Sequence, residues 1–286
     1  MTQEPASAPL FGWREYGAPN GLPVIYHHGM PGAHTEAAWL HDQARRNDVR
    51  LIVPDRPGIG ATPFTALNRI ADLVPHFCRL MDHLHVPRCH HAGWSSGGPM
   101  ALAMAALVPE RITGVSIMAS YTHFYEAGLE DSLVKPFARH TRFTRGRLVE
   151  VLVGLIRVAG WTERLLPWVY LFYLRRLCSP ADREILSQAA FRRVFMAAQT
   201  EAFRQGTSGA RQDFALQYRD WGFRLKDVQA PVMLYQGQDD PIVVRENGED
   251  LNRRLPQCDL RRIDGEGHFF PFLNGFQHEW MAALSR

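Results

Sequence analysis

The sequence predicts an α/β fold in which a mostly parallel sheet is flanked by helices and interrupted by a helical cap. Short apolar runs alternate with amphipathic helical segments up to about residue 120, and this alternation returns after about residue 225. Between the two the pattern is helical throughout. A Gly-x-Ser-x-Gly sequence also joins an apolar run to an Ala-, Leu- and Met-rich run. We therefore expect a core of residues 1–120 and 226–286 and a cap of residues 121–225.

The first half of the chain contains the clearest strand and helix signals. After a weak alternation over 11–16 and a turn signal at 18–21, the elements follow in order: a strand at 23–27, a helix at 35–47, a strand at 50–53, a helix at 68–84, a strand at 86–94, a helix at 98–108 and a strand at 112–119. Strands that alternate with helices in this way form parallel sheets covered on both faces.

The predicted cap is rich in Leu, Phe, Tyr and Trp, and is followed by a strand at 232–236, a helix at 243–255, a strand at 259–263 and a helix at 276–284. Its aromatic residues cluster in one stretch: Trp161, Trp168, Tyr170, Phe172 and Tyr173. We interpret this cluster as the core of the cap. An apolar roof over a substrate and a dimer contact are the alternatives.

Composition limits the class of protein. The 286 residues are 46% hydrophobic and 21% charged, with a formal net charge of +3, which is too small to indicate a nucleic-acid partner. Residues 121–225 hold 16 Lys and Arg against 10 Asp and Glu, which we interpret as a solvated helix face, with binding of anionic substrates or of a membrane surface as the alternatives. No leader peptide or membrane span is visible, and the four cysteines show no paired spacing. We expect a cytoplasmic protein, with self-association into a homodimer left open.

The turn at 93–97, Gly-Trp-Ser-Ser-Gly, carries the chemistry. A serine on a tight strand-to-helix turn adopts strained backbone angles, and only glycine fits at the crowded positions two residues to either side. The hydroxyl of Ser95 is thereby lifted clear of the backbone, with the positive end of a helix behind it. This arrangement predicts a nucleophilic serine.

Three further segments follow predicted strands, where open parallel sheets place their chemistry. They are His-Gly-Met-Pro-Gly at 28–32, Gly-Gln-Asp-Asp-Pro at 237–241 and Gly-Glu-Gly-His at 265–268. With the serine turn and Asp-Arg-Pro-Gly-Ile-Gly at 55–60, these segments resemble the α/β-hydrolase superfamily over nearly the whole chain, in the expected order. The resemblance implies the α/β-hydrolase fold with a cap over the active site.

The resemblance also assigns roles to individual residues. Ser95 would attack a carbonyl, and His268 would take up its proton and return it to the leaving group. A carboxylate must hold the imidazole in the correct tautomer. The 237–241 turn offers Asp239 and Asp240, and in similar families the acid lies three residues after the turn glycine, which selects Asp240.

The tetrahedral intermediate of such a reaction needs two hydrogen-bond donors. The resemblance implies that the backbone N–H groups of Met30 and Ser96 supply them, while His28 shapes the loop that carries Met30. Five residues are candidates for the substrate pocket, with core packing as the alternative for the last four: His28, Trp94, Tyr121, His123 and Phe269. No cofactor is implied. The close histidine pairs lack acidic or cysteine partners at ligand spacing, so we expect no metal.

We therefore expect a serine hydrolase that acts on a small-molecule ester or related carbonyl compound. Serine in place of aspartate at the turn argues against haloalkane dehalogenase and epoxide hydrolase chemistry. The segment at 28–32 also resembles that of proline iminopeptidases, which makes an aminopeptidase or amidase the alternative. Hydrolysis of a carbon–carbon bond and perhydrolase activity stay open, as does a receptor-like member that binds a small ligand without turnover.

Overall fold

The computed structural model describes residues 11–127 and 145–284. At its centre lies a seven-stranded sheet in the order β1-β3-β2-β4-β5-β6-β7, in which β1 runs antiparallel and the other pairs run parallel. The strands are β1 (Trp13–Gly17), β2 (Leu22–His27), β3 (Val49–Pro54), β4 (Cys89–Trp94), β5 (Ile112–Met118), β6 (Val232–Gly237) and β7 (Cys258–Ile263). The predicted fold class is confirmed.

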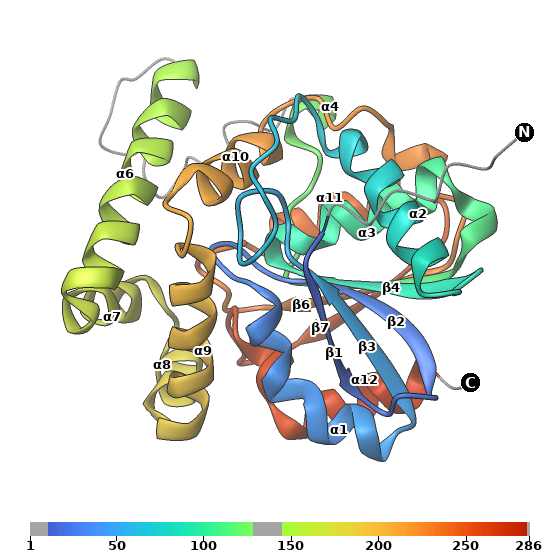
Figure 1. Ribbon diagram of the computed structural model, residues 1–286, viewed down its shortest axis with the longest axis horizontal. Coiled ribbons are helices and arrows are strands. Elements are labelled where there is room, and N and C mark those ends of the chain that lie inside the picture. Colours follow the sequence, from blue (N-terminus) through green and yellow to red (C-terminus); the bar gives the residue numbers. More distant parts are fainter. Residues whose placement is uncertain (1–10, 128–144, 285–286) are drawn as a thin grey trace, which may run out of the picture.

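Helices cover both faces of this sheet (Figure 1). α2 (Val74–His83), α3 (Gly98–Leu107) and α11 (Glu246–Arg254) lie on one face, and α1 (His41–Arg46) and α12 (Asn274–Leu284) lie on the other. Successive side chains of a strand point to opposite faces, so Ile25 of β2 packs into the first layer while Val24 and Tyr26 pack into the second. Each face of the sheet therefore has its own apolar core.

Several predicted helices are interrupted by short 3-10 turns. The predicted helix at 35–47 is a 3-10 helix, η1 (His34–Leu40), followed by α1, and the one at 68–84 is η2 (Ile70–Leu73) followed by α2. Pro75 lies in the first turn of α2, where its missing N–H costs no helical hydrogen bond. The other 3-10 turns are η3 (Ser95–Gly97), η4 (Pro109–Arg111), η5 (Leu225–Asp227) and η6 (Phe270–Phe272).

The region between β5 and β6 is helical where it is described. It contains α4 (Phe124–Ala127), α6 (Arg145–Leu165), α7 (Pro167–Leu177), α8 (Pro180–Ser187), α9 (Ala189–Ala202) and α10 (Ser208–Gln217), at the left and top of Figure 1. α9 packs onto the sheet domain through Phe191 and Phe195, whose rings lie 6.1 and 5.4 Å from that of Phe269. The boundaries of 121–225 as a separate cap stay a prediction.

The interpretation of the aromatic cluster as buried core is wrong for four of its five members. Trp161, Trp168, Phe172 and Tyr173 are 71%, 70%, 51% and 62% exposed, whereas Tyr170 is buried and bonds to Gln199. Helical periodicity shows that these residues share faces of α6 and α7, but it does not show what those faces contact. Among the described helices, none has the length and apolar character needed to cross a membrane.

Candidate active site

Ser95 lies in a strained turn between β4 and α3. Its φ of 56° falls in the left-handed region that side chains other than glycine rarely adopt. A Cβ on Gly97 would lie 2.0 Å from the carbonyl oxygen of His27, and one on Gly93 would lie 2.4 Å from the backbone of Gly97. Glycine at both positions is therefore required, and the turn presents the Ser95 hydroxyl at the carboxyl edge of the sheet.

The fold brings Ser95, His268 and Asp240 together from three loops. His268 Nε2 lies 3.1 Å from Ser95 Oγ, and His268 Nδ1 lies 2.7 Å from Asp240 Oδ2. All three residues are buried. An ionised carboxylate only accepts hydrogen bonds, so Nδ1 carries the proton and Nε2 presents a lone pair to the hydroxyl. The arrangement is able to remove a proton from Ser95.

The two adjacent aspartates have different environments. Asp240 is buried, and its Oδ1 accepts the backbone N–H groups of Ile242 and Val243, at 2.8 Å each. Asp239 is exposed, and its backbone N–H donates to the Glu266 carbonyl at 3.0 Å. The structure therefore places Asp240, and not its neighbour, against the imidazole.

The ring of His268 is held from several sides. Its backbone carbonyl accepts the Trp94 indole N–H at 3.0 Å, and the two rings lie 5.0 Å apart. Burial by itself lowers the pKa of His268, but the charge and hydrogen bond of Asp240, helped by the charges of Asp182 and Glu36, outweigh burial and raise that pKa above its ordinary value. The site therefore stabilises an imidazolium.

The loop after β2 is fixed by the Arg56 side chain. The Arg56 guanidinium donates to the carbonyl oxygens of His28 at 2.8 Å and Gly29 at 3.0 Å. It also lies 3.4 Å from Ser96 Oγ. Met30 directly follows this anchored backbone, and Ser96 directly follows Ser95. The two predicted backbone donors thus belong to segments that one buried arginine contacts.

Glu36 is a buried carboxylate that sequence reasoning missed. It lies on η1 and accepts the Tyr26 hydroxyl at 2.8 Å and the Gly29 N–H at 3.1 Å. Burial raises the pKa of Glu36 to about 7, against the lowering effect of these hydrogen bonds. The available signal was its spacing: Glu36 lies four residues before Leu40, on the apolar face of the segment.

Trp94 and Phe269, two of the predicted pocket residues, are packed in an aromatic group beside His268. Trp94 contacts the rings of Phe269 and Phe272 at centroid distances of 5.6 and 4.8 Å. Both predicted residues are almost fully buried. His28 is also buried, and its Nδ1 lies 2.8 Å from the Gly29 carbonyl.

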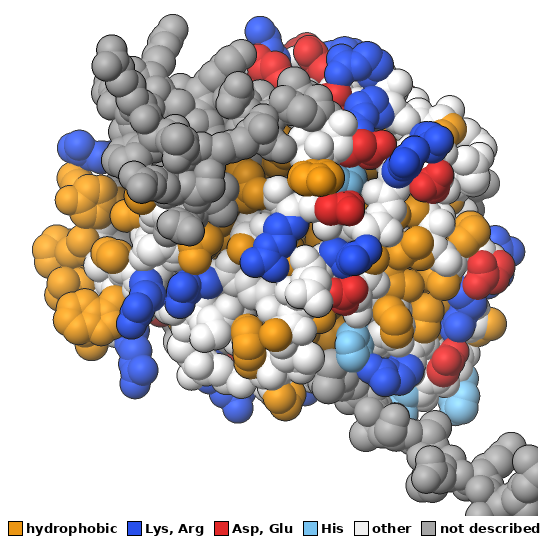
Figure 2. All heavy atoms as spheres, turned by 90° about the horizontal axis from the view of Figure 1, so that it is seen from above, with side chains coloured by type: hydrophobic (Ala, Val, Ile, Leu, Met, Phe, Trp, Pro, Cys, Tyr) orange, Lys and Arg blue, Asp and Glu red, His pale blue; other side chains and the backbone are white. Residues whose placement is uncertain are grey.

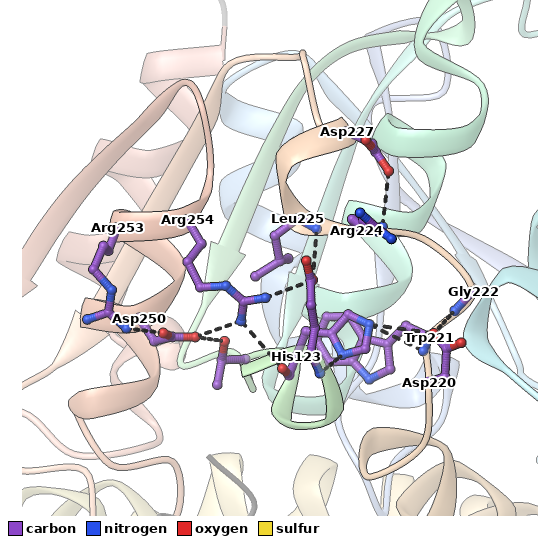
Figure 3. Close-up of polar contacts among 12 residues, drawn as sticks. His123, Asp220, Trp221, Gly222, Arg224, Leu225, Asp227, Asp250, Arg253 and Arg254 are labelled. Carbon is purple, nitrogen blue, oxygen red and sulfur yellow. Dashed lines mark hydrogen bonds and ion pairs between the residues drawn. The ribbon is translucent and has the colours of Figure 1, made fainter. Parts of the chain in front are cut away.

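Tyr121 and His123 lie where the chain leaves β5. The buried Tyr121 has its pKa raised by burial and by the charge of Asp240. His123 stacks on Trp221 at 4.4 Å, and its two ring nitrogens lie 3.3 Å from the backbone nitrogens of Glu126 and Trp221 (Figure 3). His123 therefore joins the start of the helical region to the segment by which the chain returns to the core.

A second set of contacts strengthens the same junction. Arg254 of α11 pairs with Asp250 at 3.0 Å and with Glu126 at 2.7 Å, and it lies 3.4 Å from the His123 carbonyl (Figure 3). Glu126 in turn accepts the Leu225 N–H at 3.2 Å. The segment where the chain enters the helical region and the segment where it leaves are thus bonded to one another and to the core.

Two of the close histidine pairs, at 27–28 and 90–91, are buried among other groups, whereas His83 and His85 are exposed. His27 Nε2 lies 3.0 Å from His91 Nδ1, and His90 Nε2 lies 2.8 Å from a serine hydroxyl. Burial, the largest effect on each, lowers the pKa of all three rings. Within the described ranges, one trio of metal-ligand types comes close together: His34, Asp55 and Glu201, with ligand atoms within 4.8 Å of one another. His34 Nδ1 already contacts Asp55 at 2.7 Å.

The chain is similar to known proteins along most of its length. The family described as alpha/beta hydrolase fold matches residues 23–275. An acetyltransferase component of the acetoin cleaving system from Pseudomonas putida is 30% identical over 174 residues, 54% of this chain and 46% of that relative. A proline iminopeptidase from Arabidopsis thaliana is 32% identical over 129 residues, 41% of this chain and 33% of that relative. The chain thus spans less than half the length of these two relatives.

A longer match and two solved structures cover most of the chain. A 2-hydroxy-6-oxo-2,4-heptadienoate hydrolase from Pseudomonas putida is 25% identical over 260 residues, 87% of this chain and 83% of that relative. An alpha/beta hydrolase fold protein from Nakamurella multipartita superposes with a TM-score of 0.65 at 18% identity, covering 96% and 95% of the two chains. An enol-lactonase from Burkholderia xenovorans superposes with a TM-score of 0.65 at 17% identity, covering 96% of each. At these identities the structures show a shared fold.

Proposed function

Because the chain belongs to the alpha/beta-hydrolase fold family, we propose that it is a serine hydrolase that cleaves a small, apolar carboxylic ester or related carbonyl compound through an acyl-enzyme. The observation that carries this proposal is the unbroken hydrogen-bond chain from Ser95 through His268 to Asp240. In it, Ser95 is the nucleophile, His268 the general base and acid, and Asp240 the group that orients the imidazole.

The first half of the reaction forms the acyl-enzyme. Ser95 Oγ bonds to the carbonyl carbon while its proton moves to His268 Nε2, and the carbonyl oxygen becomes an oxyanion. The intermediate then collapses, the bond to the leaving oxygen breaks, and His268 returns its proton to the departing alcohol. The elevated pKa of His268 suits the proton-accepting step, because Asp240 stabilises the imidazolium that forms.

The oxyanion would be held by the backbone N–H groups of Met30 and Ser96. Their support comes from the anchoring of both segments by Arg56. The Gly29 N–H is already bonded to Glu36, so we assign the donor role to the following amide. Loss of one such donor typically costs about 3 kcal/mol in the transition state.

The second half regenerates the serine. His268 takes a proton from water, the resulting hydroxide attacks the acyl carbon, and collapse of the second intermediate releases the carboxylic acid while the proton passes back to Ser95 Oγ. Every step uses groups of the chain, the substrate and water.

Hydrolysis of a carbon–carbon bond is the second candidate. It is favoured by the match to the 2-hydroxy-6-oxo-2,4-heptadienoate hydrolase, which covers 87% of this chain, far more than the match to the proline iminopeptidase. An aminopeptidase would in addition need free carboxylates to hold a substrate ammonium. Two acids of the helical region near the core, Asp182 and Asp213, are already buried in other contacts.

A substrate panel tests the proposal. We expect p-nitrophenyl esters of short and medium chain length to be turned over by the wild type and not by Ser95→Ala. A 2-hydroxy-6-oxo-dienoate and prolyl-naphthylamide, followed by their absorbance and fluorescence, discriminate the other two reactions. Binding of these compounds without turnover of any would instead support a receptor-like protein.

A further inference from the structure

The helices α6 and α7 carry an exposed apolar surface that the proposed chemistry does not use. Ten of the large apolar side chains that are exposed in the described part of the chain lie on these helices or between them: Val151, Leu155, Val158, Trp161, Leu165, Leu166, Trp168, Phe172, Tyr173 and Leu177. We call this set the α6–α7 surface. Figure 2 shows apolar side chains gathered at the left of the molecule, where α7 lies in Figure 1, with basic side chains beside them. A surface of this extent indicates an interaction site.

The α6–α7 surface is also basic. Over residues 151–178 the chain has four arginines, Arg157, Arg164, Arg175 and Arg176, and one acid, Glu163. Glu163 is buried and accepts the Thr200 hydroxyl at 2.6 Å. The structure describes this range throughout, apart from one uncharged side chain. Within the range, the surface therefore presents guanidinium groups and no exposed carboxylate.

Arginine and tryptophan side chains lie together in two shallow grooves of this region. Arg157, Trp161 and Arg164 border a groove of about 530 Å³. Arg164 and Trp168 border the next, of about 710 Å³, which Glu163, Glu201 and Arg204 also line. Each groove thus sets a cationic group beside an indole ring.

We propose that the α6–α7 surface binds a membrane surface that contains anionic lipids. Tryptophan and tyrosine rings with exposed apolar bodies and a polar edge favour the boundary between headgroups and acyl chains. Amphipathic helices with basic residues lie in that boundary, and the arginines add attraction to anionic headgroups. A second copy of the chain fits less well, because a two-fold contact through this surface brings two sets of arginines together, and residues 151–178 offer no exposed carboxylate to pair with them.

Vesicle sedimentation with the full chain tests this proposal. The wild type is expected to sediment with vesicles of phosphatidylcholine and phosphatidylserine, and to do so weakly with phosphatidylcholine alone or at high salt. The double variants Trp161→Ser/Trp168→Ser and Arg157→Gln/Arg164→Gln should each bind at least about tenfold more weakly. Phe64→Ser is the matched control, because Phe64 is an apolar residue of the sheet domain that is 49% exposed. This variant should bind like the wild type.

Three results would overturn the lipid proposal. They are no sedimentation with either vesicle, equal sedimentation with both, or a stable dimer in light scattering that the double tryptophan variant dissociates. The last result would assign the surface to self-association.

A different observation concerns Asp182 at the start of α8. This buried carboxylate accepts the backbone N–H of Phe269 through Oδ1, at 2.7 Å. Its Oδ2 accepts the Ser179 N–H, and Ser179 Oγ accepts the Asp182 N–H, both at 3.1 Å. Asp182 therefore closes the capping box of its own helix and bonds to the residue that follows His268.

The residue before His268 also meets this capping box. A Cβ on Gly267 would lie 2.2 Å from Asp182 Oδ2 and 2.2 Å from Ser179 Oγ, so the backbone approaches as closely as glycine allows. The N-terminus of α8 thus lies close to Gly267 and is bonded to Phe269 through Asp182.

We infer that Asp182 is a positioning residue that sets the place of His268 relative to Ser95, an inference that rests on the proposed serine-hydrolase function. The charges that face His268 come from Asp240 after β6, Asp182 on α8 and Glu36 on η1. Each raises the pKa of His268 against burial, so neutralising Asp182 lowers that pKa.

The rate of fluorophosphonate labelling of Ser95 and the turnover of an ester test this inference. Asp182→Ala is expected to lower both about tenfold or more, because the Phe269 N–H loses its acceptor and the imidazole is displaced. Asp182→Asn should restore most of the rate, because its amide oxygen still accepts that N–H. In a Glu36→Gln background, which removes the other group that titrates near pH 7, Asp182→Asn should also move the acid limb of kcat/KM to lower pH.

Ser179→Ala is the matched control, since it weakens the cap of α8 and keeps the bond to Phe269. It should stay within about twofold of the wild type. Equal losses in Ser179→Ala and Asp182→Ala, or no loss in Asp182→Ala, contradict the positioning role. A wild type that is folded and never labelled contradicts the proposed function itself, which separates the two failures.

Discussion

Arg56 and Asp213 form a buried ion pair, with Arg56 Nη2 2.7 Å from Asp213 Oδ2. The same guanidinium donates to the carbonyls of His28 and Gly29. One side chain from the loop after β3 therefore joins α10 of the helical region to the backbone that precedes Met30. The position of the proposed oxyanion donor depends on this pair.

Replacing Arg56 by lysine should lower kcat about tenfold or more, because an ammonium cannot hold two carbonyls and a carboxylate in the fixed geometry of a guanidinium. Asp213→Ala should lower the free energy of unfolding by about 3–5 kcal/mol, since it leaves a buried charge without its partner. Ester turnover and urea unfolding measure the two effects.

The partly exposed pair of Arg50 and Glu15, 2.6 Å apart, is the matched control. Glu15→Ala should change the unfolding free energy by less than about 1 kcal/mol. Equal effects at the two pairs, or an unchanged kcat in Arg56→Lys, contradict the role given to Arg56.

The pH dependence of stability should show the buried Glu36. Its pKa is raised from 4.5 to about 7 in the folded protein, so the folded state binds the proton more tightly than the unfolded state. The stabilisation is present below the unfolded pKa and is lost as the pH rises through the folded pKa. Relative to Glu36→Gln, the wild type should lose about 3 kcal/mol of unfolding free energy across that interval. Urea titrations of both proteins from pH 4.5 to pH 8 measure this difference. If the unfolding free energies of the two proteins change equally with pH, the prediction is wrong.

The serine turn should not tolerate a methyl group at Gly97. Alanine there would meet the backbone of His27 at 2.0 Å, so we expect loss of fluorophosphonate labelling, together with a lower midpoint of thermal unfolding. Gly154 of α6 is the control, because a Cβ there meets nothing within 4 Å. Gly154→Ala should stabilise the helix by up to about 1 kcal/mol, and a labelled, stable Gly97→Ala protein is the outcome against this reading.

Two tryptophans should differ sharply in their contribution to stability. Trp221 is fully buried, stacks on His123 and donates to the Gln217 carbonyl at 3.1 Å. Trp221→Ala should lower the unfolding free energy by about 3–5 kcal/mol. Trp161 is 71% exposed, so Trp161→Ala should lower the unfolding free energy by less than about 1 kcal/mol. Chemical unfolding of both variants measures the difference. Similar losses of unfolding free energy in the two variants would contradict this prediction.

Much of the sheet could be predicted from the sequence because its strands are buried on both faces. Runs such as 23–27 and 50–53 are almost continuously apolar, and parallel strands bring their carboxyl ends to one edge. That rule placed the loops of Ser95, Asp240 and His268 near one another, and the structure has them within hydrogen-bond distance.

The supporting contacts could not be predicted in the same way. Arg56 meets Asp213 and Asp182 meets Phe269 across more than 80 positions, and no local pattern encodes such a pairing. The prediction that the aromatic residues of α6 and α7 are buried was wrong for a related reason. Periodicity identifies an apolar face, and only the tertiary fold determines whether that face is covered.

The central claim is that His268 and Asp240 make the Ser95 hydroxyl nucleophilic. Intact-mass spectrometry after treatment with a fluorophosphonate measures this most directly. We predict one adduct per chain, located on Ser95 by peptide mapping, that is absent from Ser95→Ala and forms at least about a hundredfold more slowly in His268→Gln. An adduct that persists in Ser95→Ala, or a folded wild type that never acquires one, would contradict the claim.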